Sequence, residues 1–129
     1  MIKVKSIKIL VVEDEIPLQN VIRLKLEKNN FSVVTASTVD EALNKLKDTE
    51  IKVIWLDHYL VGGQNGICLV SKLMSEKRGK EMSIFVVSNT ASNDNLQSYI
   101  DLGVKQYFTK SRAKLSCIVD TIKSNLQLA

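Results

Sequence analysis

The stretch "VIWLDHYLVGGQNG", Val53–Gly66, places a charged residue at the end of a strand-like run. Its first four residues are apolar, as in a strand that is covered on both faces of a sheet. The run ends in Asp57, and glycines follow it closely at Gly62, Gly63 and Gly66. A carboxylate at the end of an apolar strand is costly unless another group pairs with it. The stretch therefore predicts a strand and, for Asp57, a partner from elsewhere in the chain.

Five apolar runs along the chain have the length and composition of β-strands. They are Ile7–Val12, Phe31–Ala36, Lys52–Leu56, Ser83–Ser88 and Val104–Thr109. The segments between them carry apolar residues at helical spacing, so strands and helices alternate. This alternation predicts an α/β fold with a parallel sheet covered on both faces. We expect a flavodoxin-like (βα)5 three-layer sandwich whose five strands have the order 2-1-3-4-5.

Several residues mark where the five expected helices begin and end. Thr38 and Glu41 have the spacing of a capping box at the start of the second helix. Pro17 suits the first turn of the first helix, and Gly103 suits the end of the fourth. The first helix, at about 17–28, has apolar residues on more than one face: Leu18, Val21, Ile22, Leu24 and Leu26. Burial of a wide face, or an error in the assigned phase, would each explain that pattern.

The composition is that of a single globular domain, which we place at residues 1–129 with a core of about 7–126. Of the 129 residues, 45% are hydrophobic and 25% are charged. No apolar run is long enough to span a membrane and the first residues do not form a signal peptide, so we expect a cytoplasmic protein. The net charge of +4 is spread among mixed lysines and acids, and "EKRGK" (Glu76–Lys80) is expected to be solvated surface.

The residues that follow the strands form a second pattern. In a parallel sheet all strands end at one edge, and ligands bind there near the point where the strand order reverses. The first strand leads to Glu13 and Asp14, and the third leads to Asp57. The fourth ends at Ser88, and the fifth leads to Lys110. We therefore expect acids, a hydroxyl and an ammonium to converge on one pocket.

This set of groups indicates phosphoryl chemistry. Carboxylates that lie close together repel one another unless a cation intervenes, and oxygen ligands of this kind suit Mg²⁺. Lys110 can hold phosphoryl oxygens, and Ser88 can donate a hydrogen bond to the same group. A carboxylate can act as the nucleophile by forming an acyl phosphate. Asp57 is the best candidate for this nucleophile. Its strand lies between the strand that leads to the acids Glu13 and Asp14 and the strands of Ser88 and Lys110.

The chain resembles a response-regulator receiver domain, the phospho-accepting partner of sensor histidine kinases. The resemblance extends from about 7 to 126, and four fragments carry it. They are "VVEDE" (Val11–Glu15), "WLDHYLVGGQNG" (Trp55–Gly66), "VVSNTAS" (Val86–Ser92) and "YFTKS" (Tyr107–Ser111). Each fragment alone is a weak signal, whereas all four in this order, at these strand ends, are specific.

The resemblance implies a role for each residue at the edge of the sheet. Asp57 would be the phosphorylated residue, and Lys110 would bind the phosphoryl group. Ser88 would move toward that group after transfer, while Tyr107 would turn inward as an aromatic switch. The ligands of Mg²⁺ would be Glu13, Asp14, Asp57 and the backbone carbonyl of Tyr59.

The resemblance also implies partners. A sensor histidine kinase or a phosphotransfer protein would give its phosphoryl group to Asp57, and hydrolysis in the same site would follow. The domain would then catalyse only its own phosphorylation and dephosphorylation, and it would not be an enzyme in any other sense. The signal would leave through the helix that ends near Gly103, the strand Val104–Thr109 and the last helix. This face would bind a downstream output domain or target protein and is a candidate homodimer interface, with neither direct nucleic acid binding nor membrane binding expected.

Three features depart from the usual pattern of the family. Ser111 follows Lys110 where a proline is common, and Asn89 stands where a small residue is usual. The loop from Asp57 to Gly66 is one residue longer than usual. These departures motivate an alternative, a pseudo-receiver that uses the same fold as a phosphorylation-independent binding module.

Two other functions are set aside on particular residues. A flavodoxin would need a phosphate-binding loop where this chain has the acidic "EDEIP" (Glu13–Pro17). A haloacid-dehalogenase-type phosphatase would need a second acid where this chain has Tyr59. His58, the only histidine, has no second ligand near it in the sequence. We expect it to lie exposed in the loop and to have no catalytic role.

Overall fold

Strands and helices alternate along the computed structural model, which describes residues 6–60, 64–88, 93–110 and 114–126. The elements are β1 (Lys8–Val12), α1 (Ile16–Lys28), β2 (Ser32–Ala36), α2 (Val39–Lys45), β3 (Ile51–Leu56), α3 (Gly66–Met74), α4 (Lys77–Glu81), β4 (Ser83–Ser88), α5 (Asn93–Leu102), β5 (Gln106–Thr109) and α6 (Leu115–Asn125). All five predicted strands are present, and each ends at the predicted residue.

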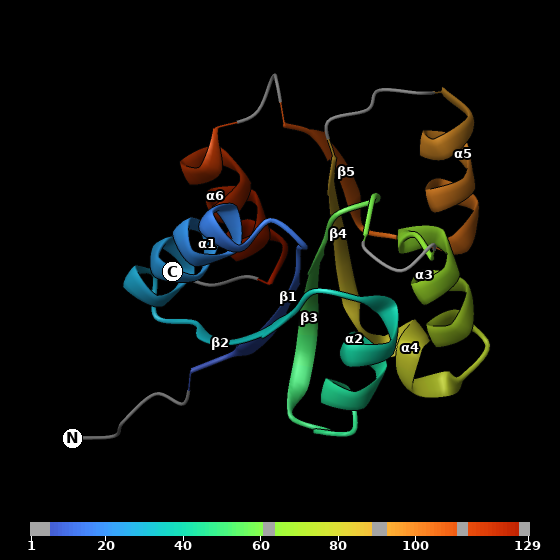
Figure 1. The fold of residues 1–129 in the computed structure, drawn as a ribbon, viewed down its shortest axis with the longest axis horizontal. Helices are drawn as coiled ribbons and strands as arrows, with labels where there is room; N and C mark the ends of the chain where they lie inside the picture. Colours follow the sequence, from blue (N-terminus) through green and yellow to red (C-terminus); the bar gives the residue numbers. More distant parts are fainter. Residues whose placement is uncertain (1–5, 61–63, 89–92, 111–113, 127–129) are drawn as a thin grey trace.

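The five strands form one parallel sheet in the predicted order β2-β1-β3-β4-β5 (Figure 1). β1 and β3 pair in regular register up to Val12 and Leu56, the last residue of each strand. The register shifts only at the start of these strands, next to Lys8, where Lys52 of β3 has no counterpart in β1. The pairing is therefore undisturbed at the edge where the polar residues follow the strands.

Two apolar clusters, one on each face of the sheet, hold the helices in place. Successive residues of a strand point to opposite faces, so Leu10 and Val12 join one cluster while Ile9 and Val11 join the other. α2, α3 and α5 cover the first face, and α1 and α6 cover the second (Figure 1). The predicted flavodoxin-like three-layer arrangement is confirmed.

Helix α4 was not indicated by the sequence pattern, which predicts five helices where the described chain has six. Its five residues, KRGKE, contain no apolar stripe. Arg78 anchors it by donating hydrogen bonds to backbone carbonyl oxygens of the segment that joins α2 to β3: those of Leu46, Asp48 (2.8 Å) and Ile51 (3.3 Å). Hydrogen bonds from a charged donor thus fix a helix that has almost no apolar surface to bury.

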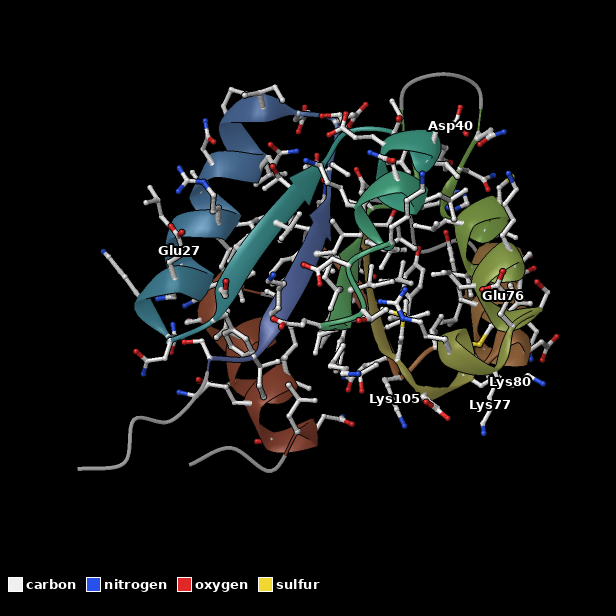
Figure 2. The ribbon with its side chains drawn as sticks, turned by 90° about the horizontal axis from the view of Figure 1, so that it is seen from below. Glu27, Asp40, Glu76, Lys77, Lys80 and Lys105 are labelled. Carbon is white, nitrogen blue, oxygen red and sulfur yellow. The ribbon has the colours of Figure 1, made fainter. Side chains whose placement is uncertain are left out.

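Gly79 lets α4 pack directly on the end of α3. A Cβ at this position would lie 1.8 Å from the carbonyl oxygen of Leu73, so no residue with a side chain fits there without a shift of the backbone. Lys77 and Lys80 of the same helix are exposed and point outward (Figure 2). The expectation of a solvated segment is correct for these lysines and wrong for Arg78 and Gly79.

The predicted helix-end signals operate as expected. The Thr38 hydroxyl accepts a hydrogen bond of 3.0 Å from the backbone N–H of Glu41, and Gly103 has a positive φ of 96° after α5. α1 does not bury a wide face, because Val21 and Leu24 are 50% and 51% exposed. Within the described ranges, no helix has both the length and the apolar character needed to cross a bilayer.

Candidate functional site

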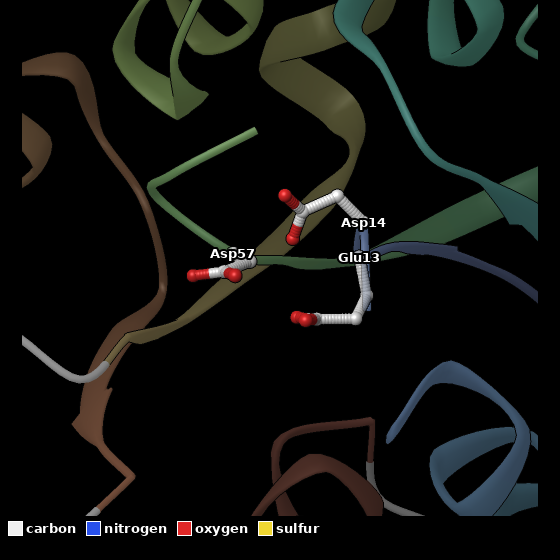
Figure 3. A group of neighbouring side chains, drawn as sticks. All are labelled: Glu13, Asp14 and Asp57. Carbon is white, nitrogen blue, oxygen red and sulfur yellow. The ribbon is translucent and has the colours of Figure 1, made fainter. Parts of the chain in front are cut away.

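Three carboxylates meet where β1 and β3 end. The backbone N–H of Asp57 donates to the carbonyl of Val12 (3.0 Å), and that of Glu13 donates to the carbonyl of Ala36 (3.0 Å), so the first residue after each strand is still held by the sheet. Glu13, Asp14 and Asp57 each offer an oxygen within 4.8 Å of the others, and their side chains point toward a common space (Figure 3). The predicted convergence of these three acids is therefore present.

The acid cluster has the chemistry of a site for a hard cation. Its ligand atoms are all oxygens, the type that Mg²⁺ prefers. Two ligands on opposite sides of Mg²⁺ lie about 4.2 Å apart, since each Mg–O bond is about 2.1 Å long. The observed spacing is compatible with that value. Glu13 and Asp57 are buried and Asp14 is half-buried, so these oxygens are largely shielded from bulk water.

Lys110 provides the partner that the sequence predicts for Asp57. Its Nζ lies 3.4 Å from Asp57 Oδ2 and 3.3 Å from Glu13 Oε2. The backbone N–H of Lys110 donates to the carbonyl of Ser88 (2.8 Å), which fixes the start of its side chain beside β4. One ammonium thus faces two buried carboxylates.

The charge on this edge changes the protonation of Glu13. Burial, and then the Asp57 carboxylate beside it, raise the pKa of Glu13 to about 7, although the Lys110 ammonium acts to lower it. A single ammonium therefore does not neutralise the acid pair fully. A cation bound between the acids would favour the charged form of Glu13.

Gln19 holds the backbone of Glu13 by a hydrogen bond, a role that the sequence analysis did not predict. Its side-chain amide, which is buried, donates to the carbonyl oxygens of Glu13 (2.8 Å) and Ala36 (3.2 Å). These bonds tie α1 to the ends of β1 and β2. The available signal was its position, since Gln19, Ile22 and Leu26 lie on one face of α1 and all three are buried.

Ser88 and Tyr107, the two predicted switch residues, lie together. Ser88 ends β4 with no exposed surface, and Tyr107 lies on the neighbouring strand β5. Burial raises the pKa of the Tyr107 phenol, while a hydrogen bond with the Ser88 side chain acts to lower it. The Ser88 hydroxyl is therefore engaged with Tyr107. Asn89 and Ser111, which depart from the family pattern, lie outside the described residues.

Tyr59, the predicted source of a backbone ligand, lies two residues after Asp57. Its side chain is 56% exposed, and its backbone pairs with Asn65 in an isolated antiparallel bridge. Asn65 in turn caps α3, because its side-chain oxygen accepts a hydrogen bond of 3.2 Å from the backbone N–H of Cys68. The bridge and the cap together fix both sides of the loop that carries Tyr59.

The expectation that His58 lies exposed in the loop is wrong. Its side chain is buried, and its Nδ1 lies 2.6 Å from the hydroxyl of Tyr99 on α5. The backbone of His58 is held as well, because the N–H of Gly66 at the start of α3 donates to its carbonyl (2.8 Å). Tyr99 is 41 residues from His58 in the chain, so no local pattern links the two.

Comparison with known proteins identifies the family. The sequence pattern of the family described as "Response regulator receiver domain" matches residues 9–123. The chain belongs to the response regulator receiver domain family. The resemblance seen in the sequence is thus confirmed, and this receiver domain shares its fold with a solved receiver domain.

Individual relatives are consistent with this assignment. The receiver domain is 31% identical over 103 residues to the phosphate regulon transcriptional regulatory protein PhoB of Escherichia coli. The match covers 80% of this chain and 44% of the length of PhoB. It superimposes on a CheY-like receiver domain protein from Methanospirillum hungatei with a TM-score of 0.85 and 24% identity, covering 95% and 94% of the two chains. The phosphorylated cyanobacterial phytochrome response regulator RcpA matches with a TM-score of 0.78 and 25% identity, over 95% and 92%.

Proposed function

We propose that this receiver domain accepts a phosphoryl group on Asp57 with the help of Mg²⁺. One observation carries the proposal: an oxygen of the Asp57 carboxylate lies within 4.8 Å of oxygens of both Glu13 and Asp14, and Oδ2 of Asp57 lies 3.4 Å from the ammonium of Lys110. A phosphoryl group on Asp57 would therefore find positive charge on both sides once a dication is bound. PhoB and the phosphorylated RcpA support the proposal as related regulators.

The transfer can be written from the residues of the site. An Asp57 oxygen attacks phosphorus, the P–N bond of the donor's phosphohistidine breaks, and its electron pair returns to the imidazole. Lys110 holds a phosphoryl oxygen, which requires it to leave its present position between Glu13 and Asp57. Mg²⁺, held by Glu13, Asp14, Asp57 and the carbonyl of Tyr59, would offset negative charge on the phosphoryl oxygens. Attack by water on phosphorus would later release phosphate and restore the carboxylate.

The conformational response would begin at Ser88. In the proposed switch its hydroxyl leaves the phenol of Tyr107 and donates to the phosphoryl group, and Tyr107 adjusts in turn. The response would reach the face formed by α5, β5 and α6, where Ile100 is 53% exposed. This face is the proposed binding site for an output domain or target protein and the candidate dimer interface.

The proposed partners follow from the family and the relatives. The phosphoryl donor is a sensor histidine kinase or a phosphotransfer protein. The chain spans less than half the length of PhoB, so the output that its signal reaches is part of this proposal. We keep two sequence-based predictions within it: this chain has no enzymatic activity beyond its own phosphorylation and dephosphorylation, and it makes no direct contact with nucleic acid.

The proposal is tested by labelling with a small phosphodonor. We expect acetyl phosphate and Mg²⁺ to add the mass of one phosphoryl group to the intact protein, and EDTA to abolish the addition. Asp57→Asn should prevent labelling, whereas Glu76→Gln, which changes an exposed acid between the end of α3 and the start of α4, should not. An unlabelled wild-type protein, or an Asp57→Asn protein labelled as well as the wild type, would contradict the proposal.

A partner-binding measurement with the same Asp57→Asn variant decides for or against a pseudo-receiver. Such a module would bind its partner equally well with Asp57→Asn, with Mg²⁺ or with EDTA. Its sequence support lies in Asn89, Ser111 and the longer loop, whose residues 61–63 are outside the described part of the chain, as are both named residues. Within the described residues, the acids and the ammonium that the transfer needs are all present.

A further inference from the structure

His58 and Tyr99 form a buried pair next to Asp57, the proposed phosphoacceptor. His58 follows Asp57 in the chain and has 3% of its surface exposed, and Tyr99 on α5 has none. The distance from His58 Nδ1 to the Tyr99 hydroxyl is 2.6 Å, and their rings meet edge to face with centroids 5.6 Å apart. This pair is outside the set of groups that the transfer uses, so its presence at this position requires its own explanation.

The two side chains are suited to share one hydrogen bond. Burial raises the pKa of the Tyr99 phenol, so the hydroxyl keeps its proton. The phenol hydroxyl can donate or accept, and the Nδ1 of a neutral imidazole does either according to the tautomer of His58. Donor and acceptor are both removed from water, and separating them without another partner would leave two buried polar groups unsatisfied.

The surrounding structure makes room for this bond. A Cβ at Gly66 would lie 2.3 Å from the Tyr99 hydroxyl and 3.2 Å from the carbonyl oxygen of Asp57, so the phenol occupies the space that a side chain would fill. The ring of Tyr99 also contacts that of Tyr107, with centroids 5.8 Å apart. Tyr99 therefore touches both the segment that follows Asp57 and the aromatic residue that the switch would move.

We propose that the hydrogen bond between His58 and Tyr99 is a latch that holds α5 against the end of β3 and opposes the response to phosphorylation. This inference rests on the proposed function. Tyr99 of α5 contacts Tyr107, which is hydrogen-bonded to Ser88, so a movement of Ser88 toward Asp57 would reach α5 through this aromatic pair. Displacement of α5 would carry Tyr99 away from His58. Because coupling between two sites is reciprocal, removing the latch should favour the phosphorylated state.

The first test measures the latch without any phosphoryl group. In metal-free Tyr99→Phe, which keeps the ring and removes the hydroxyl, we expect the amides of α5 to exchange with deuterium roughly tenfold faster relative to those of β1. His58→Leu should have the same effect, while His58→Asn, whose amide oxygen can accept in place of Nδ1, should restore much of the protection. The matched control is Gln97→Ala, which removes an exposed hydrogen bond of 2.8 Å to Asp101 on the same helix.

The second test measures the coupling with beryllofluoride, an analogue of the phosphoryl group, in the presence of Mg²⁺. We expect Tyr99→Phe to bind it roughly five- to tenfold more tightly than the wild type, and Gln97→Ala to bind it as the wild type does. Unchanged exchange of α5 in unliganded Tyr99→Phe would overturn the latch. Faster exchange with unchanged or weaker binding would overturn its link to the switch. A wild-type protein that binds no beryllofluoride would instead refute the proposed function, and the unliganded exchange would still decide whether the latch exists.

Discussion

The ammonium of Lys110 and the carboxylate of Asp57 meet at 3.4 Å, although they lie 53 positions apart in the chain. The two residues follow β3 and β5, which are separated in the sheet by β4. The same ammonium also contacts Glu13, which follows β1. Lys110 has 16% of its side chain exposed, so water screens this contact only in part. Under the proposed function, the amine would stabilise a phosphoryl group from this position and would compete with a metal ion for the same oxygens.

Replacement of this amine separates those two effects. In Lys110→Met we expect phosphodonor labelling of Asp57 to slow on the order of 10²-fold, because positive charge that stabilises the transferring group is lost. Mg²⁺ should bind more tightly to the same variant, since a like charge has been removed from the acids. A Mg²⁺ titration and a labelling time course measure the two effects. Lys105→Met, at an exposed lysine (Figure 2), is the control and should change neither.

The buried acid Glu13 should make the metal-free protein less stable as the pH rises. Its pKa is about 7 in the folded protein and 4.5 in the unfolded chain, so the folded state binds more protons between these values. The contribution is fully present below the lower value and is lost as the pH rises through the upper one. Glu13→Gln should therefore gain roughly 1–3 kcal/mol relative to the wild type between about pH 5 and about pH 8. Denaturant unfolding in EDTA measures the difference, and a gap that stays constant with pH would contradict it.

Gln19 should control both stability and metal affinity through the backbone of Glu13. Gln19→Leu keeps most of the volume but removes the amide donor from the carbonyl of Glu13 and one of two donors from that of Ala36, which should cost about 1–3 kcal/mol. Loss of this support should also weaken Mg²⁺ binding roughly tenfold, as is usual when the groups that orient metal ligands are removed. Asn20→Leu, at the exposed neighbouring position, should show neither effect in unfolding and titration experiments. Equal Mg²⁺ affinity in Gln19→Leu and the wild type would show that Glu13 does not depend on Gln19.

Arg78 should affect stability alone, because it lies far from the carboxyl edge. Arg78→Met removes hydrogen bonds to the carbonyls of Asp48 and Ile51 and should cost about 1–3 kcal/mol in the free energy of unfolding. Labelling of Asp57 should keep its rate at temperatures where the variant is folded. Lys77→Met is the control on the same helix, since that lysine is exposed. A slower labelling rate in folded Arg78→Met would reveal coupling between α4 and the phosphoacceptor edge.

The features that were predictable from the sequence share a simple origin. A parallel sheet brings all its strand ends to one edge, so Glu13, Asp57 and Lys110 could be placed together without knowledge of any side-chain contact. The strand ends themselves were clear, because each apolar run stops at a polar residue or at a turn. The strand order was expected because it is the commonest one for five alternating units, which the sequence alone does not prove, and the structure has that order.

The features that were missed depend on contacts between distant segments. α4 has no apolar period and is held by Arg78, whose partners lie 27 to 32 residues away. His58 looked like an exposed loop residue because its partner, Tyr99, comes from another helix. Gln19 is a polar residue on a buried face, and its hydrogen bonds go to backbone groups that have no sequence signature. Such contacts become visible only when the tertiary arrangement is known.

The irregular pairing beside Lys52 has a consequence for how this protein can tolerate changes in length. That extra residue is absorbed at the amino end of β3, far from the acids, and the ladder above it stays aligned. One residue inserted later, between Val53 and Leu56, would rotate every following side chain to the opposite side of the sheet. Asp57 would then leave the face of Val53 and Trp55, which α1 and α6 cover, for the opposite face, away from Lys110. Insertions and deletions in natural variants should therefore occur at the amino ends of the strands and be absent from the carboxyl half of β3.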